Sequence, residues 1–129
     1  MTPELRDILH TPYKLGGRAV GTGIDCLGVV GEIARRRGLP SPDGWPSIRD
    51  AWERGEIDSA SGFPPGWRQV EPPCELCDHD VLLFFHPVPW CAIVDDGYVW
   101  SASHLQGSAY CVPAFRWRTV PSEVWRWSP

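Results

Sequence analysis

A single cysteine, Cys26, stands at the point where a glycine-rich loop meets an apolar run. The loop begins at Pro12 and Tyr13 and contains the pair Gly16-Gly17. The apolar run is typical of a helix. At a helix start, unpaired backbone N–H groups and the positive end of the helix dipole stabilise a thiolate. Cys26 is therefore a candidate nucleophile. The alternative is a buried cysteine that acts as a small apolar side chain.

A second group of thiols begins at Cys74 and Cys77, a CxxC pair that His79 follows two residues later. Two thiolates at this spacing can bind zinc, join an iron–sulfur cluster, or form a disulfide or redox pair. A closed zinc site needs four ligands, and His79, Cys91 and Cys111 are candidates for the others. A CxxC pair without a partner pair is also found in plain loops. We expect no cofactor, with zinc or an iron–sulfur cluster at Cys74 and Cys77 as the alternative.

Three tryptophans, Trp117, Trp125 and Trp127, lie close together near the C-terminus and alternate with arginines. Tryptophan and arginine are enriched among the residues that dominate binding at protein interfaces. This segment is therefore a candidate partner-binding surface. The alternative is that the three rings pack in the core.

Three helices are predicted in the N-terminal half. The first starts with Thr2 as its cap and Pro3 in its first turn, and it ends before Pro12. The second covers residues from about 26 to 37, and a third, short helix starts at Ser47. The apolar residues of the second helix recur at helical spacing on one face. They are Leu27, Val30, Ile33 and Ala34.

Strand candidates follow in the C-terminal half, where short apolar runs are bounded by turn residues. They are Trp67 to Val70, Val81 to Phe85, Trp90 to Val94, Tyr98 to Ala102, Ala109 to Val112 and Glu123 to Trp127. The segment Asp95-Asp96-Gly97 is a hairpin signal. Helices over about 1–54 followed by strands over about 67–127 predict a single α+β domain that covers residues 1–129.

Composition excludes several function classes. The net charge is −4 without a basic patch, so we expect no nucleic-acid partner. No apolar run reaches about 18 residues, so we expect no membrane span. The N-terminal residues lack the pattern of a signal peptide, so we expect synthesis in the cytoplasm without export by that route. Five cysteines are an odd number, which fits poorly with a full disulfide framework.

The segment around Cys26 resembles the nucleophile block of the NlpC-type cell-wall cysteine peptidases. The residues that carry the resemblance are Tyr13, the Gly16-Gly17 pair and the D-C-L-G-V-V run at 25–30. The resemblance implies a compact papain-like fold, in which helices pack on an antiparallel sheet and the nucleophile begins one helix. It also places Tyr13 near the site that binds the oxyanion.

The strands are similar to one branch of that family, found in the tail tips of long-tailed phages and gene transfer agents. That branch reads G-D-V-L-L-F, then H-C-A-I, an acidic or glycine turn, and I-H-A. The corresponding segments here are H-D-V-L-L-F from His79, W-C-A-I from Trp90 and W-S-A from Trp100. The likeness extends over residues from about 10 to 105.

Two positions depart from the pattern of the family. Trp90 occupies the position of the general base, and Ser101 occupies the position of the third residue, which orients that base. An indole has an N–H donor and no basic lone pair, so Trp90 cannot accept the proton of Cys26. A substitute base would have to come from His104 or His86, each brought to the thiol by its loop. The alternative is that these histidines are structural.

The resemblance and its departures together predict a degenerate, non-catalytic NlpC-like domain. We expect it to serve as a structural or adaptor component of a phage or phage-like tail tip, located in the virion tail, and in contact with hub or central fibre proteins. The alternative is an active cysteine peptidase or amidase that cleaves peptidoglycan stem peptides during DNA entry. In that case Cys26 attacks the carbonyl, and Tyr13 with nearby backbone N–H groups stabilises the oxyanion. A cellular acyltransferase or a thiol-redox role is the remaining alternative.

Overall fold

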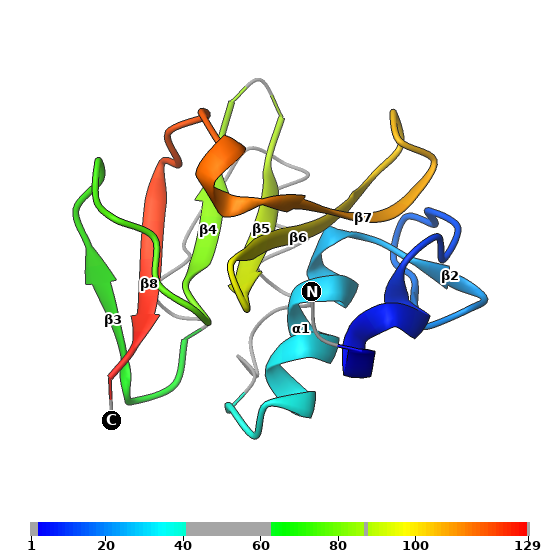
Figure 1. Cartoon of the computed structure of the whole chain (residues 1–129), viewed down its shortest axis with the longest axis horizontal. Helices are drawn as coiled ribbons and strands as arrows, with labels where there is room; N and C mark the ends of the chain where they lie inside the picture. Colours follow the sequence, from blue (N-terminus) through cyan, green and yellow to red (C-terminus); the bar gives the residue numbers. More distant parts are fainter. Residues whose placement is uncertain (1–2, 41–62, 87, 129) are drawn as a thin grey trace.

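The structure is a computed structural model that describes residues 3–40, 63–86 and 88–128. Within these ranges one α-helix and a large antiparallel sheet form a mixed α+β architecture (Figure 1). The Thr2 cap and the third helix expected from Ser47 lie outside the described residues. None of the helices in the described ranges has the length and apolarity needed to cross a membrane.

The large sheet has six strands in the order β3-β8-β4-β5-β6-β7, and Figure 1 shows them side by side. Their bounds are β3 Trp67–Val70, β4 Val81–Phe84, β5 Trp90–Asp95, β6 Tyr98–Ser103, β7 Ser108–Pro113 and β8 Glu123–Trp127. All six predicted strands are confirmed to within about one residue at each end. The hairpin between β5 and β6 turns at Asp96 and Gly97, which both have positive φ, the backbone that a tight two-residue turn requires.

The N-terminal segment differs from the expectation in two ways. Its first helix is the 3-10 helix η1, Pro3–Ile8, in which Leu5 and Ile8 are buried. The glycine-rich loop contains an unpredicted two-stranded hairpin, β1 Arg18–Ala19 and β2 Gly23–Ile24. This hairpin leads the chain directly into the helix that carries Cys26.

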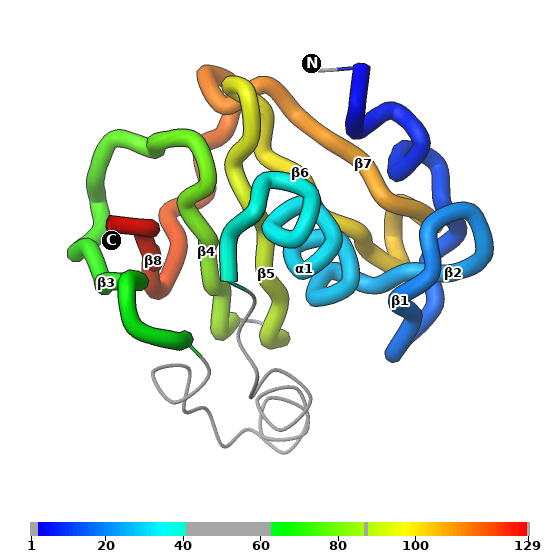
Figure 2. Tube along the Cα trace, turned by 90° about the horizontal axis from the view of Figure 1, so that it is seen from below, coloured from blue at the N-terminus to red at the C-terminus, as the bar shows by residue number. Residues whose placement is uncertain are grey.

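The helix α1, Cys26–Arg36, lies beside β5 and β6 (Figure 2). Its start is close to the hairpin because Gly28 has no side chain. A Cβ at Gly28 would lie 2.6 Å from both the Gly17 carbonyl oxygen and an Ile24 side-chain carbon. The missing side chain therefore lets the first turn of α1 contact the loop before it.

Both faces of the sheet are covered by apolar side chains. The helix-side core lies between the sheet and α1, and its buried members include Leu5, Ile24, Val30, Ile33, Cys91, Ile93, Trp100, Ala102 and Trp125. The outer core lies on the opposite face, and its buried members are Leu82, Phe84, Ala92, Val94, Val99 and Val124. Since successive strand residues point to opposite faces, β4 and β5 contribute side chains to both cores.

The arginines at the end of α1 attach the helix to its neighbours. Arg36 forms two hydrogen bonds with the Asp7 carboxylate of η1, at 2.6 and 2.7 Å. Arg37 forms two with Asp95 of β5, both at 2.8 Å, and this carboxylate raises the pKa of Arg37. Arg35 pairs with Glu32 within the helix. Two of these three arginines therefore hold α1 to other elements, in addition to complementing the helix dipole.

Candidate functional site

Asp25 fixes the geometry of the helix start. It is buried, it is the N-cap of α1, and its carboxylate accepts a hydrogen bond from the Gly28 N–H at 2.8 Å. The same carboxylate accepts from the Gly16 N–H at 2.9 Å and pairs with Arg18 at 2.6 Å. One side chain thus caps the helix and holds the loop and the hairpin against it.

Cys26 is the first residue of α1 and is half-buried against the helix-side core. Its partner is Cys91 of β5, a fully buried free thiol in the same core. The Cys91 thiol donates a hydrogen bond to the Cys26 sulfur, and the Cys91 backbone adds another. The site therefore consists of two thiols in contact, one partly exposed and one enclosed.

This contact separates the acidities of the two thiols. The hydrogen bond from Cys91 lowers the pKa of Cys26 below its ordinary value, against the opposing effects of burial and of the Asp25 carboxylate. Burial raises the pKa of Cys91 well above its ordinary value, and donation to Cys26 raises it further. Cys26 is the sulfur that ionises, and Cys91 remains the hydrogen-bond donor.

The structure corrects the expectation that Trp90 stands at the position facing Cys26. Trp90 packs in the outer core, where its ring stacks on Phe84 at a centroid distance of 3.9 Å. Cys91, the next residue, points to the opposite face and contacts Cys26. Neighbouring residues of a strand lie on opposite faces of the sheet, so Trp90 lies on the face away from Cys26.

Ser101 is also on the face away from α1, because its neighbours Trp100 and Ala102 both belong to the helix-side core. It is fully buried, and its hydroxyl donates to the Cys91 carbonyl oxygen at 2.7 Å. The Tyr110 side chain hydrogen-bonds to the same hydroxyl. Ser101 therefore fixes the backbone at Cys91 and does not orient an imidazole.

Tyr13 and His104 meet beside the glycine-rich loop. Tyr13 pairs with Ile24 in an isolated bridge, and its backbone N–H donates to Gly107 at 3.0 Å. The His104 ring, from the turn between β6 and β7, lies edge-on to the Tyr13 ring at 6.1 Å. The turn between β6 and β7 therefore brings His104 to Tyr13. The side chain that most lowers the pKa of the Cys26 thiol is that of Cys91.

The other histidines lie in different surroundings. His79 is within 3.4 Å of the Asp95 carboxylate, next to the Arg37 pair. His86 is exposed in the loop after β4, and His10 is exposed between η1 and the bridge at Pro12. Each is placed by its own loop.

The CxxC segment is a loop held by a buried ion pair. The Asp80 carboxylate, fully buried, accepts two hydrogen bonds from Arg126 of β8, both at 2.9 Å, and one from the Cys77 N–H at 2.8 Å. Arg126 also donates to the Glu75 carbonyl oxygen. Burial raises the pKa of Cys74. These contacts describe a structural loop.

The proposed ligands of the CxxC pair are not assembled. Cys74 packs on the outer core, whereas Cys111 packs on the helix-side core, across the sheet. His79 is engaged with Asp95. Within residues 3–40, 63–86 and 88–128, no three side chains of histidine, cysteine, aspartate or glutamate form a group that could hold a metal ion.

The three C-terminal tryptophans do not form one surface. Trp125 is buried and stacks on Phe63 at 4.4 Å, and Trp127 lies edge-on to Trp67 at 5.5 Å, both on the helix-side core. Trp117 packs on the outer core instead. The interpretation of the three as a joint partner-binding cluster is therefore corrected, because their rings pack on opposite faces of the sheet.

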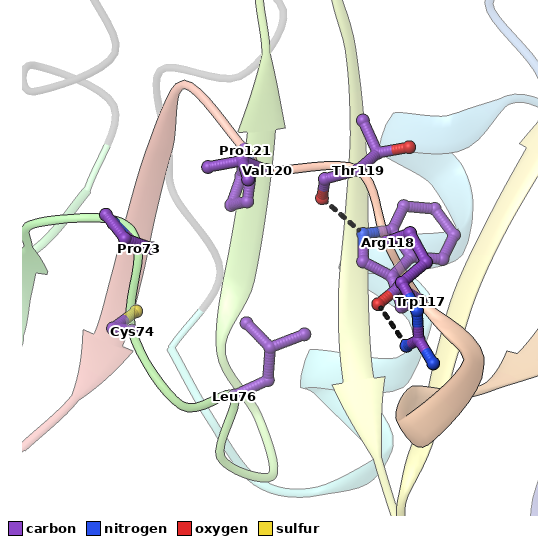
Figure 3. Close-up of a pocket in the computed structure, with 8 residues that line it drawn as sticks. All are labelled: Pro73, Cys74, Leu76, Trp117, Arg118, Thr119, Val120 and Pro121. Carbon is purple, nitrogen blue, oxygen red and sulfur yellow. Dashed lines mark hydrogen bonds between the residues drawn. The ribbon is translucent and has the colours of Figure 1, made fainter.

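Trp117 lines a shallow pocket of about 130 Å³ (Figure 3). Its indole N–H donates to the Thr119 carbonyl oxygen at 2.8 Å, one of the two contacts drawn in Figure 3. The other walls include Pro73, Leu76 and Pro121. This volume is below the roughly 300–1,000 Å³ of small-molecule sites, and the pocket adjoins the outer core, on the other face of the sheet from Cys26.

Sequence reasoning missed the partners of the residues that it singled out. The sequence indicates Cys91 only as a candidate metal ligand, and it gives no role to Arg18, Asp80 or Arg126. Cys91 could have been recognised as an alternative to Trp90 by testing the neighbouring register of the strand. The ion pair of Asp80 and Arg126 spans 46 positions, and no local pattern signals it.

In comparisons with known proteins, no protein-family model and no curated protein matches this chain. The site is interpreted from its own residues.

Proposed function

We propose that the chain is an NlpC-like domain of papain-like fold that has lost peptidase activity and serves as a structural adaptor in the tail tip of a phage or phage-like particle. Its partners are neighbouring tail proteins such as the hub or central fibre proteins. The sequence resemblance around Cys26 and the β4–β6 segments supports the tail context, and the residue that contacts Cys26 supports the loss of activity.

The proposed loss of activity rests on the identity of the side chain next to the Cys26 sulfur. The side chain that contacts the Cys26 sulfur belongs to Cys91, whose pKa lies well above its ordinary value. A thiol with a raised pKa cannot take a proton from Cys26 at neutral pH, and it cannot deliver one to a leaving amine as an imidazolium does. A cysteine is present at the nucleophile position, and the side chain in contact with it is a hydrogen-bond donor and not a base.

The alternative, an active cysteine peptidase or amidase that cuts peptidoglycan stem peptides, is favoured by the lowered pKa of Cys26. A thiolate at a helix start can attack a carbonyl without a base to deprotonate it. Tyr13 and backbone N–H groups near Cys26 would then stabilise the oxyanion, and His104 beside Tyr13 is the nearest candidate for the acid. This alternative must form and resolve an acyl-enzyme.

The loss of activity predicts no hydrolysis of cell wall. Purified peptidoglycan incubated with the protein at neutral pH should release no more free amino groups or soluble fragments than with Cys26→Ser. Serine is close to cysteine in size and the cap of α1 is unchanged in this variant. A difference between the two proteins is therefore due to the loss of the sulfur atom. Turnover that vanishes in Cys26→Ser would establish the peptidase alternative, and a covalent acyl adduct on Cys26 in mass spectra would support it.

The adaptor role predicts that the protein is part of a particle. Phage-like particles purified from a culture that expresses the chain should contain it in fixed proportion to tail proteins after repeated density-gradient purification. Cross-linking should join it to tail proteins and not to capsid proteins. Its recovery only in the soluble fraction, free of particles, would contradict the tail location. This readout is independent of hydrolysis.

A further inference from the structure

Two free thiols from distant parts of the chain meet in the helix-side core. Cys26 begins α1 and is half-buried, whereas Cys91 lies within β5 with none of its surface exposed. The sulfur atoms are joined by a hydrogen bond. Cys26 is the less buried residue of the two, so a reagent from solvent meets it before it meets Cys91.

We propose that Cys26 and Cys91 form an intramolecular disulfide when a peroxide reaches Cys26, with Cys91 acting as the resolving thiol. In the first step the Cys26 thiolate attacks a peroxide oxygen and the O–O bond breaks. The sulfur becomes a sulfenic acid, and the other oxygen leaves as hydroxide, which combines with the proton that Cys26 released on ionisation to give water. In the second step the Cys91 sulfur attacks the Cys26 sulfur, the S–O bond breaks, and the hydroxide that leaves combines with the Cys91 proton as water.

The chemistry of each thiol suits its step. The lowered pKa of Cys26 and its partial exposure are the two properties that select a cysteine for oxidation by peroxide. The Cys91 thiol, enclosed in the core, is protected from direct oxidation and remains available to resolve the sulfenic acid. A protonated thiol attacks more slowly than a thiolate. Because the Cys91 side chain is already in contact with Cys26, no diffusion step is needed, and this proximity compensates for the slower attack.

The surrounding structure favours closure without rearrangement of the sheet. The Ser101 hydroxyl holds the Cys91 carbonyl at 2.7 Å, and the Asp25 cap holds the helix start. A disulfide needs its sulfur atoms at about 2.05 Å, and sulfur atoms in hydrogen-bond contact reach this separation through a small side-chain movement. While the bond exists, Cys26 has no free thiolate, so any acyl chemistry at the site is switched off until a thiol reduces it.

The experiment must distinguish this pair from the CxxC pair, whose thiols are also free. The native chain is treated with dilute hydrogen peroxide, its remaining thiols are blocked, and the protein is digested. Trypsin alone leaves Cys74, Cys77, Cys91 and Cys111 in one peptide, since no lysine or arginine lies between Arg68 and Arg116. A second protease that cuts after aromatic residues separates them, because Trp90 precedes Cys91 and Tyr110 precedes Cys111.

The expected product is a peptide pair joined through Cys26 and Cys91, which separates after addition of dithiothreitol. In Cys91→Ser the sulfenic acid on Cys26 should persist, so that labelling of Cys26 by dimedone rises at least several-fold. Cys111→Ser, a half-buried cysteine of the same core, is the matched control and should behave as the native chain. A link confined to Cys74 and Cys77, or a Cys26 that proceeds to sulfinic acid in the native chain, would overturn the proposal.

Discussion

Replacement of Asp80 by alanine is expected to lower the free energy of unfolding by about 3 kcal/mol. The carboxylate is fully buried and accepts two hydrogen bonds from Arg126 and one from the Cys77 N–H. Breaking a buried ion pair costs about 3–5 kcal/mol because the remaining charge loses its partner. The lower end applies here, since the Arg126 side chain is 22% exposed and can regain contact with water. Urea denaturation followed by tryptophan fluorescence measures the loss.

A double-mutant cycle tests the cause of this loss. Arg126→Met removes the opposite charge, and the double variant should be less destabilised than the sum of the two single variants, because no charge is left unpaired. Asp78→Ala, in the same turn, is the matched control. Asp78 is exposed and accepts one hydrogen bond from the Gly97 N–H, so its loss should be below about 1 kcal/mol. Equal effects of Asp78→Ala and Asp80→Ala would contradict the assigned role of the buried pair.

Replacement of Cys91 by histidine is expected to make Cys26 about tenfold more reactive toward iodoacetamide at pH 6. An imidazole at this position faces the Cys26 sulfur, and a thiolate–imidazolium pair lowers a cysteine pKa by one unit or more. A lower pKa raises the thiolate fraction at every pH below it, so the midpoint of the alkylation profile moves to lower pH. Cys91→Ala removes the hydrogen bond that lowers the pKa of Cys26, so its midpoint should move to higher pH.

Trp90→His is the matched control for this experiment, because it introduces the same ring one position earlier in β5. Trp90 stacks on Phe84 in the outer core, so the new ring would lie across the sheet from Cys26 and leave the alkylation midpoint unchanged. Circular dichroism verifies the fold of each variant, since enlarging a buried side chain costs about 1–3 kcal/mol. A shift in Trp90→His together with none in Cys91→His would show that the assignment of faces is wrong.

The helix start could be predicted because its determinants are local. Asp25 lies three residues before Gly28, whose N–H it caps, and the apolar periodicity of α1 extends over the next residues. The strands could be predicted for the same reason, since β-branched and aromatic runs bounded by turn residues define them individually. The hairpin within the glycine-rich loop could not, because its strands are only two residues long and have no apolar pattern.

The roles of the CxxC loop and the tryptophans could not be predicted in this way. Cys74 and Cys111 lie on opposite faces of the sheet, and their separation depends on how β7 and the loop before β4 pack. Trp125 and Trp127 are two residues apart in β8 and share the helix-side face. Which face they occupy, and the opposite position of Trp117, depend on strands from other parts of the chain.

By itself the sequence determined the order of the elements, the capped helix start with Cys26 as its first residue, and the turn at Asp96 and Gly97. Each of these depends on residues within a few positions of one another. Only the tertiary structure decided which residue of β5 contacts Cys26. Apolar side chains cover both faces of the sheet, so β4 is apolar throughout, β5 is apolar from Trp90 to Val94, and neither sequence alternates. Without alternation, nothing in the sequence of a strand indicates which of its side chains point toward the helix. A shift of one residue in the assumed register of β5 therefore places Trp90 instead of Cys91 on the face toward Cys26.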